Sequence, residues 1–184
     1  MVKEINVDLM PALIPFEGAE NKQGIFQNTT HILGFEFDGT ACFRKGTKAG
    51  PNALRYVSDG IESYSPYLDA DVDDISFVDL GNLPIDLSID EKSAKADIES
   101  TYNKTNKTFV TLFDDVALKE NNIRLLTLGG EHSTSYAPIK KYLSEFANLV
   151  VLPLNAHADL CEGYLEYRYS HASIIRRITD HFGE

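Results

Sequence analysis

Residues 123–133 read Ile-Arg-Leu-Leu-Thr-Leu-Gly-Gly-Glu-His-Ser, a short apolar run that stops at two glycines and continues into polar side chains. A short apolar run bounded by turn residues is typical of a strand that is buried on both faces in a parallel sheet. Residues 149–159 follow the same plan, since an apolar run at 149–154 leads into Asn-Ala-His-Ala-Asp. These two stretches predict parallel strands that end in polar side chains at one edge of a sheet.

The rest of the chain alternates strand and helix around them. Apolar runs predict two further strands, at 31–37 and 75–80. A helix is expected to open at Gly50-Pro51 with Ala53, Leu54, Val57 and Ile61 on one apolar face, and another at a capping box of Ser88 and Glu91, with a stripe continuing to Val116. Two later helices are expected over 136–146 and 170–181. Four alternations predict a three-layer α/β/α sandwich with a mainly parallel sheet, formed by residues 1–184 as a single domain.

Composition and charge narrow the class of protein. The 184 residues are 43% hydrophobic, with 28 acidic and 17 basic side chains and a net charge of −11. Such a chain is globular, and its acidity disfavours nucleic acid and anionic membranes as partners. Two cysteines, Cys42 and Cys161, form no metal-binding or disulfide pattern, which fits a reducing compartment. No secretory leader or membrane-spanning run is recognised, so a cytoplasmic location is expected.

The polar residues at the two strand ends are candidates for a metal site. His132 follows the strand at 123–128, and Asn155, His157 and Asp159 follow the strand at 149–154. In an extended chain, alternate residues point the same way, so positions 155, 157 and 159 could hold one centre together. Imidazoles and a carboxylate are suitable ligands for a divalent metal. Hydrogen-bonded structural histidines explain the same pattern, and the residues alone leave both interpretations open.

Several motifs, in order, resemble the ureohydrolase family of arginases and agmatinases. Gly-Gly-Glu-His-Ser at 129–133 and Asn-Ala-His-Ala-Asp at 155–159 are similar to the first two metal motifs of that family. The stretch from Gly34 to Arg55, with Gly50-Pro51-Asn52-Ala53-Leu54-Arg55, is similar to its N-terminal glycine- and arginine-rich region. Tyr-Ser-His-Ala at 169–172 resembles the bacterial agmatinase branch. The resemblance extends from Gly34 to the last residue.

The resemblance implies a two-manganese hydrolase that cleaves agmatine to putrescine, a polyamine precursor, and urea. By motif, His132 and Asp159 would bind one Mn²⁺, His157 the other, and position 155 would bridge both. His171 would exchange protons with solvent or with the departing amine. The partner would be a small cationic guanidino compound, and the full-length form would be a homo-oligomer.

Neighbouring residues have simpler expected roles. Glu131 could support a metal ligand or be solvated, and Arg44 and Arg55 are expected in structural ion pairs. Arg176 and Arg177 are expected on a solvated helix face. Tyr164, Tyr167 and Tyr169 are expected to border the pocket.

Two departures from the family pattern weaken the predicted site. Asn155 stands where the family has an aspartate, and a neutral amide lacks the charge that holds two cations together. The family's later Asp-x-Asp motif and substrate-orienting glutamate have no counterpart. We therefore expect at most one weak Mn²⁺ site and no urea release from this chain.

The same departures leave the extent of the fold and the function open. The family sheet has the strand order 2-1-3-8-7-4-5-6, so strands three and four should either lack partners in a C-terminally truncated domain, which we favour, or pair directly in a reduced sheet. A non-catalytic paralogue that acts as a scaffold or regulatory subunit is the main alternative function. A deacetylase-like single-metal hydrolase is a third, which the motifs at 129–133 and 169–172 disfavour.

Overall fold

The computed structural model describes residues 1–90 and 92–182 of the chain. Its central sheet has three parallel strands in the order β4-β1-β5, where β1 is Thr30–Phe35, β4 is Phe77–Asn82 and β5 is Arg124–Gly129. These strands lie within two residues of the predicted runs at 31–37, 75–80 and 123–128. The central strand β1 is almost entirely buried, as expected for an apolar run with a partner on each side.

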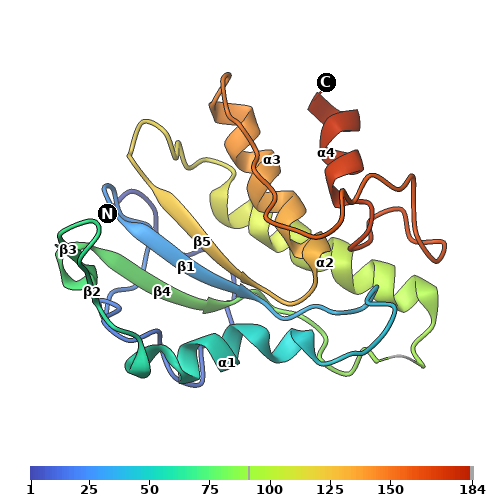
Figure 1. The fold of residues 1–184 in the computed structure, drawn as a ribbon, viewed down its shortest axis with the longest axis horizontal. Coiled ribbons are helices and arrows are strands. Elements are labelled where there is room, and N and C mark those ends of the chain that lie inside the picture. Colours follow the sequence, from blue (N-terminus) through green and yellow to red (C-terminus); the bar gives the residue numbers. More distant parts are fainter. Residues whose placement is uncertain (91, 183–184) are drawn as a thin grey trace.

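Helices cover both faces of the sheet, which confirms the predicted α/β/α arrangement. The helix α1 (Gly50–Tyr56) lies on one side, and α2 (Lys95–Phe113) and α3 (Tyr136–Glu145) lie on the other (Figure 1). The main core forms where α2 packs on the sheet, and it includes Leu33 and Phe35 of β1 with Phe109 and Leu112 of α2. A smaller cluster on the opposite face joins Ile32, Phe77 and Leu128.

The remaining elements are short. A small antiparallel hairpin is formed by β2 (Tyr64–Ser65) and β3 (Ala70–Asp71), and α4 (Ile174–Phe182) ends the described chain. Single 3-10 turns occur at η1 (Thr47–Ala49), η2 (Ser58–Gly60), η3 (Val72–Asp74) and η4 (His132–Ser135). Of the helices in the described part of the chain, none combines the length and apolarity needed to cross a bilayer.

The orientation of α1 corrects the sequence-based expectation. Its apolar positions face solvent, with Leu54, Val57 and Ile61 exposed by 47%, 53% and 58%, and Val57 and Ile61 lie beyond the end of the helix. Arg55 points inward instead, and its guanidinium donates to both oxygens of Asp79 at 2.7 and 2.8 Å and to Asn82 Oδ1 at 2.6 Å. This buried ion pair fixes which face of α1 meets the sheet, because a buried carboxylate requires a partner.

The close approach of β1 and β4 also depends on a glycine. A Cβ at Gly34 would lie 1.8 Å from Oδ1 of Asn82, the oxygen that accepts from Arg55. Only glycine leaves room for this arrangement. The glycine at position 34 therefore allows the buried polar group beneath α1 to form.

The second helix starts later than its sequence predicts. It begins at Lys95, and Ala94, the residue before it, provides no side-chain cap. Ser88 instead donates to Oδ1 of Asp86 at 2.6 Å, so a local turn uses the hydroxyl that was expected to cap the helix. Glu91, the other member of the predicted capping box, lies outside the described residues. The predicted stripe is nevertheless confirmed from Ile98 onward: Ile98, Tyr102, Thr105, Phe109 and Leu112 are buried.

The predicted strand at 149–154 does not form. Val150, Leu152 and Leu154 are exposed by 85%, 77% and 92%, and residues 149–154 pair with no described strand. Direct pairing between this segment and β5 in a reduced sheet is therefore not what the structure shows. An apolar run becomes a strand only where a neighbour satisfies its backbone groups.

Candidate metal and proton-transfer site

The first half of the site is built at the carboxyl end of β5. Gly130 N donates to Phe35 O at 3.0 Å and Glu131 N to Phe37 O at 2.8 Å, so the loop after β5 lies against the chain that leaves β1. A Cβ at Gly130 would lie 2.0 Å from the Phe37 carbonyl oxygen, which excludes any larger residue without a backbone shift. The glycine pair therefore serves the backbone, and this close contact positions η4, which begins with His132.

Three of the predicted metal ligands converge on one point. Nδ1 of His132 lies 2.5 Å from Oδ2 of Asp159, and Nδ2 of Asn155 donates to the same oxygen at 2.5 Å. Nδ2 of Asn155 is also 3.4 Å from Nδ1 of His132. These side chains come from segments more than 20 residues apart in sequence, and they meet although residues 149–154, which were expected to form a strand leading to Asn155, do not form one.

The segment from 155 to 159 does not adopt the extended form that was expected. Residues 155–157 form a bend, and Asp159 has a left-handed backbone with φ of 49°. The backbone N–H of His157 donates to Oδ1 of Asn155 at 3.3 Å. Because the chain bends, Asn155 and Asp159 meet, while the His157 side chain forms no hydrogen bond with any of the described residues.

All five predicted site residues nevertheless line one cavity of about 360 Å³, together with Cys42, Phe43 and Arg44. An adjoining cavity of about 530 Å³ is lined by His157, Asp159 and His171, and also by Tyr164 and both cysteines, which are free. Tyr164 therefore borders the site as expected. Tyr167 and Tyr169 line a different, smaller cavity beside α2.

Glu131 and Thr40 form a buried polar contact behind His171. Oε1 and Oε2 of Glu131 each lie 2.6 Å from the Thr40 hydroxyl, and Ser133 Oγ donates to Oε1 at 2.8 Å. The backbone N–H of His171 donates to the Thr40 hydroxyl oxygen at 3.2 Å. Glu131 is thus buried and hydrogen-bonded, which contradicts its interpretation as a solvated carboxylate. The sequence did not indicate a role for Thr40, because no local pattern marks a hydroxyl whose hydrogen-bond partner lies 91 residues later in the chain.

The Glu131 carboxylate also acts on the His171 ring. Oε2 of Glu131 lies 3.5 Å from Nδ1 of His171, and the ring of Tyr164 packs edge-on against the imidazole. The carboxylate raises the pKa of His171 above its usual value, while partial burial acts in the opposite direction. The protonated form of His171 is therefore favoured relative to a solvated histidine.

Four arginines were assigned from sequence, and the structure confirms two assignments. Arg55 is in the buried ion pair with Asp79, as expected, and Arg176 is exposed and pairs with Asp180. Arg44 lines the cavity and places its guanidinium over the Phe43 ring, with no ion pair among the described residues. Arg177 was expected in solvent and is buried, with Nη2 lying 2.9 Å from Asp180 and 3.2 Å from Glu162.

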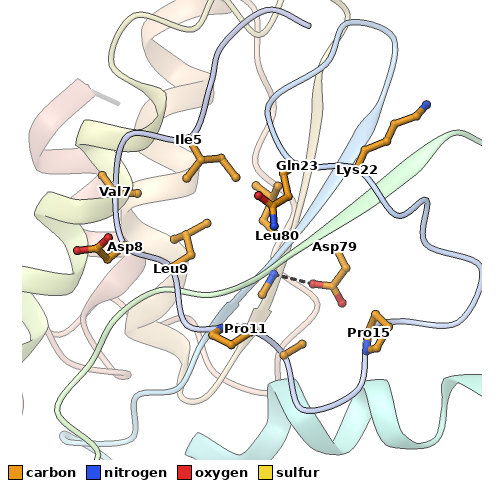
Figure 2. Close-up of a pocket in the computed structure, with 12 residues that line it drawn as sticks. Ile5, Val7, Asp8, Leu9, Pro11, Pro15, Lys22, Gln23, Asp79 and Leu80 are labelled. Atoms are coloured by element: carbon orange, nitrogen blue, oxygen red, sulfur yellow. Dashed lines mark hydrogen bonds between the residues drawn. The ribbon is translucent and has the colours of Figure 1, made fainter.

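A separate cavity of about 470 Å³ lies between the N-terminal arm and β4 (Figure 2). Its wall combines polar groups with apolar side chains, among them Ile5, Val7, Leu9 and Leu80. Of its two carboxylates, Asp8 and Asp79, Asp79 is already bonded to Arg55 and accepts from Gly81 N at 2.9 Å. Its lining includes no histidine, whereas three histidines line the cavity at the end of β5, which is therefore the candidate site.

The donor types, an imidazole, a carboxylate and an amide, are ones that a single divalent cation can use. An imidazole nitrogen and a carboxylate oxygen already lie within 2.5 Å of each other, and the Asn155 amide could add its oxygen after a half-turn about Cβ–Cγ, because its nitrogen now faces Asp159. Among the described residues, no three His, Cys, Asp or Glu side chains are grouped closely enough to hold a metal by themselves. Two adjacent cations need bridging carboxylates, and Asp159 is the one carboxylate of this cluster.

The fold and the site together define an α/β protein with a cavity lined by histidine, asparagine and aspartate side chains at the carboxyl end of β5. Residues 28–183 match the model of the arginase family, and the chain belongs to that family. It is 32% identical over 152 residues to the agmatinase of Bacillus cereus and 32% identical over 151 residues to that of Pyrococcus horikoshii.

Solved structures show the same fold. The formimidoylglutamase of Bacillus subtilis matches with a TM-score of 0.69 and 19% identity, covering 98% of this chain and 53% of that chain. The agmatine ureohydrolase of Thermoplasma volcanium matches with a TM-score of 0.66 and 23% identity, covering 94% and 52%. The alignment with the Bacillus cereus protein covers 83% of this chain and 48% of that protein. The chain thus spans about half the length of the relatives it matches.

Proposed function

We propose that this chain carries the metal-binding and proton-transfer residues of an agmatinase-like ureohydrolase, which hydrolyses the guanidino group of agmatine to putrescine and urea. The observation that carries the proposal is the convergence of His132, Asn155 and Asp159 in a cavity that His157 and His171 also line. Family membership and the similarity to proteins named agmatinase support it. The whole protein would act in the cytoplasm, as a homo-oligomer, on a small cationic guanidino compound.

Each residue has a proposed role in this reaction. His132 and Asp159 would hold Mn²⁺, with the Asn155 amide oxygen as a neutral third ligand and His157 at the same rim. When bound, a divalent cation makes a nucleophile available from water at neutral pH. His171 would exchange a proton with solvent or the departing amine, and Glu131 would favour its protonated form. Thr40 would keep Glu131 in place through its hydroxyl contacts.

The neutral residue at 155 limits what this chain can do. We expect one weak Mn²⁺ site, and no urea release from agmatine above background, because groups that act as a unit in catalysis fail together. Calorimetric titration with Mn²⁺ and a urea assay on the same preparation test both expectations. Two tight Mn²⁺ sites, or robust turnover by the unmodified chain, would contradict the proposed assignment.

Asn155→Asp is the variant that sharpens this test. A second carboxylate beside Asp159 should increase Mn²⁺ affinity by about tenfold or more, since it adds a charged ligand to a site with one carboxylate. Urea release should stay at background in this chain. Asn121→Asp is the matched control, because it makes the same change outside the cavity and should leave Mn²⁺ affinity unchanged.

A non-catalytic paralogue is the second candidate function, and one observation favours it. The Asn155 amide donates to Asp159, so the cluster is hydrogen-bonded without a cation. If this interpretation is right, the chain binds no Mn²⁺ at millimolar concentration, and Asn155→Asp does not create a site. The same titration therefore separates the two functions.

A further inference from the structure

The segment 54–75 exposes apolar side chains along its whole length. It runs from α1 through η2 and the β2–β3 hairpin to η3, on the side of the molecule away from α2 and α3 (Figure 1). Its exposed apolar residues include Leu54, Val57, Ile61, Tyr67, Leu68 and Ile75. We call this the outer surface of 54–75. Exposed apolar groups that gather on one element often mark an interaction site.

The outward direction of these side chains is fixed by the core. Rotating α1 to bury Leu54 would remove Arg55 from Asp79, with which it forms a fully buried ion pair. Leu54 lies on the exposed side of α1, Val57 follows the end of the helix, and Ile61 follows η2, so all three are exposed within one short stretch of chain. The hairpin follows directly along the chain and is closed at its base by Val72 N, which donates to Ser63 O at 3.0 Å. The exposed apolar groups therefore follow one another along a single stretch of the chain.

The charge of this surface is entirely negative. Residues 56–75 contain six carboxylates and no Lys, Arg or His, which is six of the net eleven negative charges of the chain. The carboxylates are Asp59, Glu62, Asp69, Asp71, Asp73 and Asp74. None of them forms an ion pair with a described residue. The neighbouring N-terminal arm adds a further carboxylate, since Glu17 N donates to Ser58 Oγ at 2.9 Å.

We propose that the outer surface of 54–75 is a docking surface for a basic amphipathic segment of another protein. Apolar side chains of that segment would cover Leu54, Val57 and Ile61, while its Lys or Arg residues would pair with Asp59 and Glu62. A second copy of this chain that docked face to face through the same surface would bring the six carboxylates against themselves, and like charges across an interface oppose association. Nucleic acids are excluded for the same reason.

A synthetic amphipathic helix of leucine and lysine, labelled with a fluorophore, is the probe for this surface. Its binding to the chain, followed by fluorescence anisotropy, should weaken as salt rises, because the pairing is electrostatic. Asp59→Lys combined with Glu62→Lys should weaken it by about tenfold or more. Asp114→Lys combined with Glu120→Lys reverses two exposed charges elsewhere and should change the affinity by about twofold or less. Both variants change exposed residues, and circular dichroism verifies that they fold.

The apolar contribution is tested separately. Val57→Ser combined with Ile61→Ser should weaken peptide binding at high salt, where charge is screened, and a peptide with glutamate in place of lysine should not bind. Equal losses for the two charge-reversal variants would overturn the proposal. It would also be overturned if sedimentation showed a dimer that Val57→Ser with Ile61→Ser dissociates, because the surface would then belong to a second copy. None of these measurements depends on the metal site.

Discussion

The strand β1 and the segment 149–154 are both short apolar runs, yet they have opposite environments. In β1, Ile32, Leu33 and Phe35 are buried, and the strand is hydrogen-bonded to β4 on one side and β5 on the other. In the segment 149–154, alternate residues are almost fully exposed, and residues 150–154 form no backbone hydrogen bond with any described residue. Both runs are apolar, so what differs between them is the presence of neighbouring strands: β1 has one on each side, and 149–154 has none among the described residues.

This difference shows what stabilises the sheet. A strand contributes to stability when its backbone groups are paired and its side chains are covered by another layer. The run β1 has α1 on one face and α2 on the other, whereas 149–154 follows α3 along the surface (Figure 1). We therefore expect substitutions to have large effects around β1 and small effects in 149–154.

The largest effect is expected from Arg55→Met, which removes the cation beneath α1. Asp79 would keep a buried charge without its partner, which costs about 3–5 kcal/mol of unfolding free energy. Urea unfolding followed by circular dichroism measures this loss. Arg176→Met is the matched control, because Arg176 is exposed and pairs with Asp180 at the surface, so a loss within about 1 kcal/mol is expected. Equal losses in the two variants would show that the buried pair does not fix α1.

Leu33→Ala tests the covered strand directly. Leu33 is buried against the α2 side of the core, so its truncation leaves a cavity and should cost about 3 kcal/mol. The unfolding midpoint in urea should fall with little change in the slope of the transition. A loss below about 1 kcal/mol would mean that this part of the core collapses around the missing side chain.

Acid should weaken β1 through His31, which is fully buried and accepts a hydrogen bond from Phe26 N at its Nε2. Burial lowers the pKa of His31 to about 4 from an ordinary value near 6.5. The neutral form is therefore favoured in the folded state, so its contribution to stability is complete above pH 6.5 and is lost as the pH falls towards 4. At pH 5 the loss amounts to about 2 kcal/mol.

Comparison with the variant His31→Leu isolates the contribution of His31 protonation to the unfolding free energy. The variant lacks the titrating ring, so from pH 7 to pH 5 the unfolding free energy of the parent chain should fall by about 2 kcal/mol relative to that of the variant. The measurement is urea unfolding of both proteins at each pH. A constant difference would contradict the assigned role of His31.

The smallest effect is expected from Leu152→Ala. Its side chain is exposed, so the unfolding free energy should change by less than about 0.5 kcal/mol. Amide hydrogen exchange extends the test to the backbone: amides of β1 should be strongly protected, and those of 150–154 should exchange nearly as fast as in an unstructured chain. Strong protection in 150–154 would show that this segment has a pairing partner in solution.

Much of the fold could be predicted because its signals are local. The strands β1 and β5 and the helix α3 follow from apolar runs and helical spacing, and the structure confirms them. The face of α1 could not be predicted, since it depends on a contact between Arg55 and Asp79, which are 24 residues apart. The exposure of 149–154 could not be predicted either, because an apolar run does not reveal whether a partner strand is present.

The site also combines features that local sequence signals predict with features that depend on distant contacts. The position of His132 agrees with the rule that ligands gather at the carboxyl ends of parallel strands, but Asp159 follows a segment that forms no strand, so the rule does not explain why the two meet. His157 forms no hydrogen bond with that pair, because residues 155–157 form a bend in place of the expected extended chain. Glu131 was noticed next to His132, but its burial depends on Thr40, on the opposite side of the loop.

The contacts of the Thr40 hydroxyl have a consequence for the order of folding. This group joins Glu131, 91 residues later in the chain, and His171, 131 residues later. Thr40 and Glu131 follow the paired strands β1 and β5, so the pairing of those strands also brings this contact together. The contact with His171 closes a further segment of chain, so the cavity should be completed after β1 and β5 have paired.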